Sequence, residues 1–288
     1  MKEVLCRAYP YRPTVVAAAL TIFVGLSLPF IPTGIDWTDV LRPATIAFLR
    51  LQNPYQIQGS LNPPWLFVLL APIAILPENI GGALLFWLNL ATWMVIAKKL
   101  GSGNVICFLA VVTSPMVINS LVAGNVDFLV MWGLLLPPEL AIFFLTIKPQ
   151  VGGAALFYIA LRTYHESGTK RVLQIFAIPL ALITLSLILY GAWPLEANKI
   201  LNMSWNASPL RMFGWPSVAI GFIILLFGIS RKCPKEGANI SMASTPFFSP
   251  YVGSQSWVAI LPSLIKTKAL YFMWIALWLW VAYRTLIR

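Results

Sequence analysis

The chain has 288 residues, of which 59% are hydrophobic and only 10% are charged, and its mean hydropathy is +0.81. A soluble domain carries about 25% charged residues, so this composition excludes one and predicts an integral protein of the lipid bilayer. The net charge of +11 comes from Lys and Arg residues that stand singly or in pairs at the ends of apolar segments. Such residues orient membrane helices, and we therefore expect no nucleic-acid partner.

The apolar segments lack the alternation of barrel strands, so helices are the only structure that satisfies their backbone in lipid. We predict an all-α fold, in which residues 1–288 form one polytopic helical bundle of about ten spans. The predicted spans cover residues 13–31, 64–77, 79–97, 103–123, 125–147, 150–163, 171–191, 214–230, 247–265 and 268–286.

Several predicted helices are short or broken. Segments 64–77 and 150–163 are short for a full crossing, and Pro137-Pro138 interrupts 125–147. An alternative division makes 125–136 one short span and 139–162 a second one, interrupted at Lys148-Pro149-Gln150. Broken helices at membrane depth are tolerated where they line protein or a water-filled cavity.

The basic residues weakly favour an orientation with the N- and C-termini in the cytoplasm, in a bacterial plasma membrane. In this orientation residues 32–63 form an external loop with interfacial helices, and residues 192–213 form a second external loop. Residues 231–246, rich in Gly, Ser and Pro, are predicted as a flexible cytoplasmic loop.

The first external loop holds Asp36 and Asp39, two of the three aspartates of the chain. They are three residues apart and would share one face of a helical turn. A carboxylate at the membrane interface can take a proton from an acceptor hydroxyl, and burial would raise its pKa while Arg42 or a metal ion would lower it. The alternative is a solvated acid, or an N-cap for a helix that begins near Pro43.

Other polar residues lie at the ends of apolar segments. Asp127 in GNVD is an acid close to hydrocarbon, which indicates function, although it could instead cap a helix together with Asn125. Lys148 stands in a helix break and suits a lipid phosphate, or it only marks the helix end. In the second loop, cations beside tryptophans suit a phospholipid or polyprenyl-phosphate headgroup, although interfacial tryptophans are ordinary. The candidate substrate-binding residues are Arg42, Asn125, Asp127, Lys148, Gln150, Lys199 and Arg211.

Cofactor chemistry has little support in the sequence. Cys6, Cys107 and Cys233 lack metal-ligand spacing, and the single histidine, His165, has no partners. No phosphate-binding loop or nucleophile elbow is present. We expect no metal site built by the protein, and a divalent cation is left open as a cofactor.

Five short elements follow one another along the chain, and together they resemble the integral membrane glycosyltransferases of the C fold class, especially the family 87 mannosyltransferase-like group. No single element is specific, and the likeness spans residues 13–265. The elements are IDWTDVLRPATIAFLRLQNPY at 35–55, NPPW at 62–65, GNVD at 124–127, IKPQ at 147–150 and FFSPYVGSQSW at 247–257.

The resemblance implies transfer of a hexose, such as mannose, from a polyprenyl-phosphate donor to an acceptor hydroxyl at the external face, with inversion at the sugar carbon. It implies that Asp36, the acid after the first helix, is the catalytic base. The family usually has Gln where this chain has Asn125. The alternative functions are a lipid or solute transporter, for which repeated halves are absent from the sequence, and a non-catalytic scaffold subunit.

Overall fold

A computed structural model describes residues 21–101, 103–201, 203 and 206–286, with the backbone alone for residues 197–200. All regular secondary structure in these residues is helical, which confirms the predicted all-α class. Three helices are long and apolar enough to cross a membrane: α4 (Glu78–Leu100), α9 (Pro149–Tyr190) and α14 (Ala269–Leu286). A bent pair, α5 (Val105–Val112) and α6 (Pro115–Ala123), could provide a fourth. The described chain is therefore consistent with a membrane protein, but it does not confirm about ten spans.

The first part of the chain builds the segment that carries Asp36. An apolar helix over Thr21–Phe30 is followed by the π-helix η3 (Trp37–Leu41), which runs into α2 (Arg42–Leu49) and then a 3-10 turn, η4 (Pro54–Gln56). Residues 32–63 thus contain helical segments. The next helix, α3 (Pro64–Ala74), begins at the Pro63-Pro64 pair, because proline has a fixed φ and needs no amide partner in a first turn.

The middle of the chain consists of short helices interrupted at prolines. Residues 125–147 divide into α7 (Asp127–Met131), the 3-10 turn η5 (Trp132–Leu134) and α8 (Pro138–Leu145). The chain therefore breaks both at Pro137-Pro138 and at Lys148, the two places that the sequence indicated. Buried residues of these helices and of α4 form one continuous apolar core with Trp37, Trp93 and Met131.

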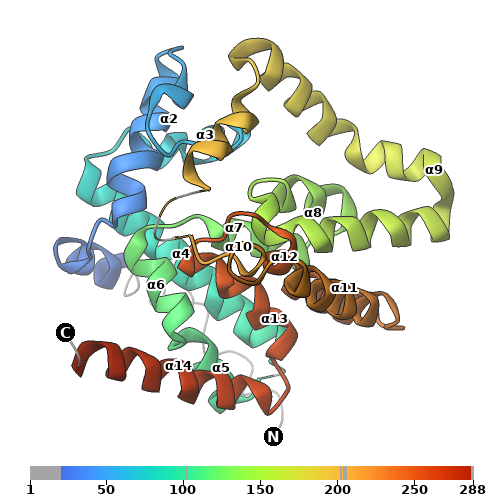
Figure 1. The fold of residues 1–288 in the computed structure, drawn as a ribbon. Helices are drawn as coiled ribbons and strands as arrows, with labels where there is room; N and C mark the ends of the chain where they lie inside the picture. Colours follow the sequence, from blue (N-terminus) through green and yellow to red (C-terminus); the bar gives the residue numbers. More distant parts are fainter. Residues whose placement is uncertain (1–20, 102, 202, 204–205, 287–288) are drawn as a thin grey trace, which may run out of the picture.

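The long helix α9 is two helices joined at Gly168, whose φ of 75° is outside the helical region. A φ in this range is accessible to glycine without the steric cost that a Cβ would add. The two arms run in different directions, as Figure 1 shows. They correspond to the predicted segments 150–163 and 171–191, which the chain joins without a loop.

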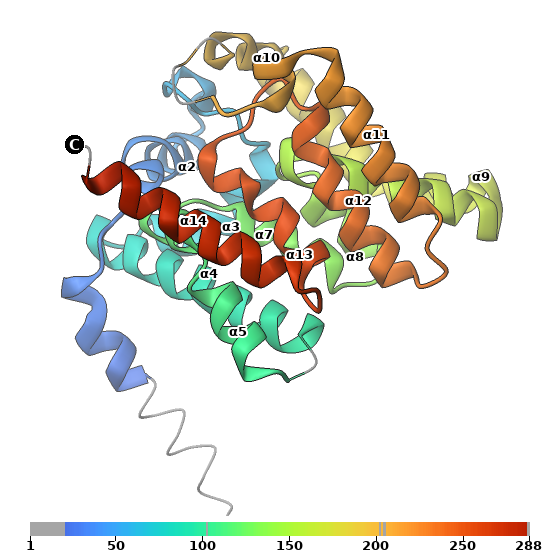
Figure 2. The ribbon, with the colours of Figure 1, turned by 60° about the horizontal axis from the view of Figure 1, so that its bottom comes forward.

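The last third of the chain corrects two predictions. The stretch 231–246 is not a flexible loop, because α12 (Pro234–Phe248) fills it and packs against α9 and α11 (Trp215–Ile229). Figure 2 shows α11 and α12 side by side. Buried Gly, Ala and Ser residues of α12 allow this close approach, as is common between membrane helices. A composition that suggested a loop therefore reflects tight helix packing.

The predicted span 247–265 is also wrong. The chain leaves α12 at Ser249, continues as an extended segment, and forms the 3-10 helix η7 (Ser254–Ile260) and the short α13 (Leu261–Leu264). Residues 192–213 contain two short elements, η6 (Trp193–Ile200) and α10 (Pro209–Phe213), and neither is long enough to cross a membrane.

Candidate functional site

Close backbone packing around Trp37 fixes the position of Asp36. Trp37 is fully buried, and its indole N–H donates to the carbonyl of Glu78 at 3.0 Å. Gly34 and Gly124, both at positive φ, lie so close that a Cβ on Gly34 would stand 2.5 Å from the Gly124 amide nitrogen. Only glycine fits such an approach, and it brings Asp36 beside Asn125, which follows Gly124 in the chain.

One oxygen of the Asp36 carboxylate is held by two side-chain amides. Asn125 Nδ2 donates to Asp36 Oδ2 at 2.7 Å, and Gln255 Nε2 donates to the same oxygen at 3.3 Å. The other oxygen, Oδ1, accepts no hydrogen bond within the described part of the chain, and Asp36 does not cap a helix. The residue is only half-buried. A fixed carboxylate with one uncommitted oxygen is thus available to a reactant.

Asp127 and Lys148 form a buried ion pair beside Asn125. Lys148 Nζ lies 2.6 Å from Asp127 Oδ1 and donates to Asn125 Oδ1 at 3.0 Å. Ser256 Oγ donates to Asp127 Oδ2 at 2.9 Å. Asp127 is fully buried, and both of its oxygens are engaged. Its side chain therefore does not cap α7, and it neutralises Lys148.

Asn125 connects the two acids. Its Oδ1 accepts from the Asp127 amide at 2.8 Å as well as from Lys148, which leaves Nδ2 oriented toward Asp36. The Asp127 amide at the start of α7 thus has its acceptor in the Asn125 side chain, and the N-cap residue of this helix is Val126. Asn89 of α4 donates to the backbone carbonyl of Asn125 at 3.4 Å and to Ser120 Oγ at 3.2 Å. These two hydrogen bonds hold the turn at Asn125 against α4.

Burial raises the pKa of Asp36 above the usual range of an aspartate, because the charged form loses its hydration. The Lys148 charge and the Asn125 and Gln255 hydrogen bonds lower this pKa in part, and Asp127 raises it further. Burial also raises the pKa of Tyr251, with both acids contributing, so its hydroxyl remains protonated near them.

Removal of Gln255 as a donor should change the pH dependence of any reaction in which Asp36 is the base. The carboxyl must be ionised to take a proton, so activity falls as the pH drops through its raised pKa. Gln255→Leu removes a hydrogen bond to the ionised form, and we expect the acid limb of kcat/KM to move to higher pH. The matched control is Gln52→Leu, which changes an exposed glutamine in the segment that follows Asp36. An unchanged limb in Gln255→Leu would contradict the arrangement.

Three predicted site residues lie outside the polar cluster, which consists of Asp36, Asn125, Asp127, Lys148, Gln255 and Ser256. Asp39 is exposed, and among the described residues its carboxylate accepts a hydrogen bond only from the neighbouring Thr38 hydroxyl. Arg42, the first residue of α2, contacts the connection between α3 and α4. Its Nη2 donates to the Leu76 carbonyl at 3.2 Å, and its Nη1 lies 3.7 Å from Glu78 Oε2. Gln150 follows Lys148 in the first turn of α9 and makes no hydrogen bond to the cluster. Asp39 lies within the π-helix η3, whereas Asp36 directly precedes it and is the one that contacts the cluster.

The remaining two candidates belong to residues 192–213. Arg211 Nη1 donates to the carbonyls of Leu201 and Met203 at 2.6 and 3.0 Å, and the residue remains exposed. The side chain of Lys199 lies outside the described residues.

Gln255 and Ser256 were not predicted as site residues. The signal was present in the polar run Ser254-Gln255-Ser256, which interrupts an apolar stretch.

Hydrogen bonds of the Asn206 side chain join this segment to the one that carries Arg211. Asn206 Oδ1 accepts from the Val252 amide at 3.1 Å, and its Nδ2 donates to the Pro250 carbonyl at 3.0 Å. Ala207 and Ser208 add hydrogen bonds to Val252 and Ser249.

The cluster is built from two carboxylates, one ammonium and neutral amides and hydroxyls. In the described residues, no group of three or more His, Cys, Asp or Glu side chains is arranged to hold a metal ion. A divalent cation at Asp36 would therefore need further oxygen ligands from a substrate. No protein-family model, curated protein or solved structure matches this chain.

Proposed function

We propose that the chain is an inverting membrane glycosyltransferase that moves a hexose from a polyprenyl-phosphate donor to an acceptor hydroxyl, with Asp36 as the general base. The observation that carries the proposal is the Asp36 carboxylate, fixed through Oδ2 by two amides while Oδ1 remains uncommitted. Burial raises its pKa and so improves its match to proton transfer near neutral pH.

The proposed step begins when the acceptor hydroxyl donates its proton to Asp36. The acceptor oxygen attacks the anomeric carbon of the hexose, the bond from that carbon to the phosphate oxygen breaks, and polyprenyl phosphate leaves with the electron pair. One displacement inverts the configuration at that carbon. Asp127 cannot share the role of base, because Lys148 and Ser256 occupy both of its oxygens.

Exposed apolar helix surfaces are the path that we propose for the lipid donor. α11 and the second arm of α9 expose large apolar side chains, among them Ile188, Phe222 and Ile223. The polar cluster lies at breaks between short helices, which is where non-helical backbone at membrane depth is tolerated.

Transfer itself tests the function. The purified chain in liposomes receives a polyprenyl-phosphate hexose labelled in the sugar, together with membrane glycans as acceptors. We expect labelled product and released polyprenyl phosphate in equal amounts. Donor that remains intact across hexose donors and acceptors would favour the scaffold alternative, and movement of label across the bilayer without a new glycosidic bond would favour a transporter.

Arg211 is our candidate for the donor phosphate. The Asn206 hydrogen bonds join the segment of Arg211 to the segment that carries Gln255. The guanidinium of Arg211 is exposed, and its Nη2 and Nε make no hydrogen bond to described residues. A charge-assisted hydrogen bond is worth about 1.5–3 kcal/mol, so Arg211→Ala should raise the donor KM about tenfold or more with little change in kcat. Arg50→Ala, at an exposed arginine after α2, is the control. An unchanged donor KM in Arg211→Ala would exclude this role.

A further inference from the structure

A second polar and aromatic site lies where the segment that begins with Asp36 meets the end of α9. The pocket has a volume of about 570 Å³ and is lined by Asn53, Tyr55, Gln56, Tyr190, Trp193 and Glu196, together with two small or aliphatic neighbours. Small-molecule sites typically have volumes of about 300–1,000 Å³. Neither the base nor the ion pair of the polar cluster contributes to this pocket.

The aromatic rings of the pocket are fixed before any ligand arrives. Tyr55 and Trp193 stack with centroids 4.8 Å apart and planes 9° apart, and Tyr190 meets Tyr55 edge-on at 5.7 Å. The Tyr55 hydroxyl donates to the Asn62 carbonyl, and the Trp193 indole N–H donates to Ser186 Oγ. Both polar handles are thus used by the protein, and since Trp193 is buried, the apolar surface for a ligand comes from Tyr55 and Tyr190.

The rest of the lining supplies hydrogen bonds. Asn53 Oδ1 accepts from the Tyr55 amide at 2.9 Å, which orients the NH₂ group of Asn53 as a donor. Gln56 is exposed and carries both a donor and an acceptor, and Glu196 adds acceptor oxygens. Donors, acceptors and aromatic surface together suit a neutral polyhydroxylated ring.

We propose that this pocket is a saccharide-binding subsite, which holds a sugar ring of the acceptor glycan in the reaction proposed for Asp36. The helix α2 separates the pocket from Asp36 along the chain and is about 12 Å long, by the helical rise of 1.5 Å per residue. Asp36 does not line the pocket, so a ring bound there is not the ring whose hydroxyl reacts. The acceptor is therefore a glycan of at least two sugar rings.

A quaternary ammonium headgroup is the competing ligand, since aromatic rings and an acid also recognise such cations. It requires ring faces that are open toward one point, whereas Tyr55 and Trp193 cover each other's faces. It also leaves the amides of Asn53 and Gln56 without partners. The pocket favours the sugar for both reasons.

Direct binding without a donor tests the proposal separately from turnover. The full chain in phosphatidylglycerol nanodiscs, which contain neither sugar detergent nor choline, is titrated with mannobiose, with phosphocholine and with inorganic phosphate, and saturation-transfer NMR reports contact. We expect mannobiose to bind, and Tyr190→Ala and Gln56→Ala each to weaken it about tenfold. Gln56 is exposed, so its variant should fold even if Tyr190→Ala does not.

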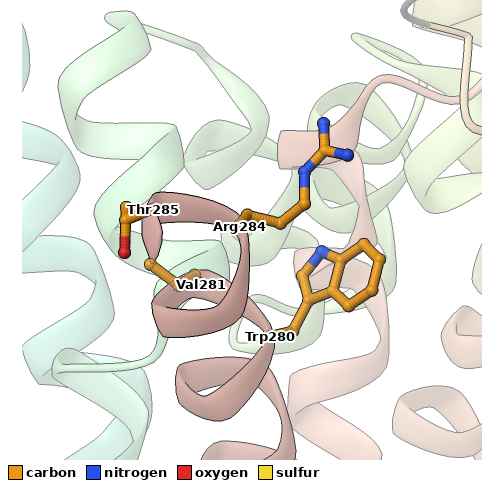
Figure 3. A pocket seen from close by; sticks show the side chains of 4 residues that line it. All are labelled: Trp280, Val281, Arg284 and Thr285. Atoms are coloured by element: carbon orange, nitrogen blue, oxygen red, sulfur yellow. The ribbon is translucent and has the colours of Figure 1, made fainter. Parts of the chain in front are cut away.

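Trp280→Ala is the control that should bind mannobiose like the unaltered chain. Trp280 lines a different, smaller pocket of about 230 Å³ on α14, where the Arg284 guanidinium lies over its ring, as Figure 3 shows. Absence of mannobiose binding, or phosphocholine or phosphate binding with the same dependence on Gln56, would overturn the proposal. Binding without transfer would refute the enzyme but keep the subsite. Transfer with an acceptor KM that Gln56→Ala leaves unchanged would support the enzyme but refute the subsite.

Discussion

Replacing Lys148 with methionine is expected to lower the free energy of unfolding by about 3–5 kcal/mol. The reason is that Asp127 is fully buried, and its Oδ1 would lose the ammonium that lies 2.6 Å away. Asn125 Oδ1 would lose a donor at the same time. Denaturant unfolding in mixed micelles, followed by far-UV circular dichroism, measures the change.

Two further variants identify the cause of that loss. In the double variant Asp127→Asn/Lys148→Met no buried charge remains, so it should recover much of the stability lost in Lys148→Met. Arg162→Met removes an exposed ion pair with Glu166, and a loss of no more than about 1 kcal/mol is expected for its electrostatic part. Equal losses in Lys148→Met and Arg162→Met would show that the buried pair is not a structural requirement.

The second large effect is kinetic. Asp36→Asn preserves the shape of the side chain but removes its ability to accept a proton, and the rate of hexose transfer should fall by about 10²–10⁴. Donor binding should change little, because the amide can occupy the same place between Asn125 and Gln255. The measurement is single-turnover transfer from saturating polyprenyl-phosphate hexose.

Asp39→Asn is the matched control for the kinetic effect. Asp39 has the same side chain and lies three residues away, but it is exposed, and within the described part of the chain its carboxylate accepts a hydrogen bond only from Thr38. Its rate should therefore stay close to that of the unaltered chain. Equal rates for Asp36→Asn and the unaltered chain would refute the assignment of the base.

The sequence predicted the polar cluster in part because its members interrupt apolar runs. Asp36, Asn125, Asp127 and Lys148 stand at segment ends in three separate parts of the chain, and the structure brings them together. Gln255 escaped prediction because its segment was assigned to a span, where a polar residue has no evident partner. Only the tertiary contact with Asp36 reveals its role.

Helix boundaries were less accessible to sequence reasoning than helical class. Hydropathy does not distinguish a span from a short helix that packs in the protein interior, so α3 and α8 resembled parts of spans although they have 11 and 8 residues. In α12, Gly and Ser indicated a loop by composition, but they serve close packing against Tyr158 and α11. Packing partners far apart in sequence decide such cases.

The most direct test of the proposed reaction is a cryo-electron microscopy map of the chain with a polyprenyl-phosphonate hexose, in which carbon replaces the oxygen that joins sugar and phosphate. The account predicts that the sugar lies beside Asp36, with room for an acceptor hydroxyl about 2.6–3.2 Å from Oδ1. The prenyl chain should run along the exposed apolar side chains of α11 or of the second arm of α9, and the phosphonate should contact Arg211. A sugar bound away from Asp36, or an analogue that does not bind at all, would contradict the account.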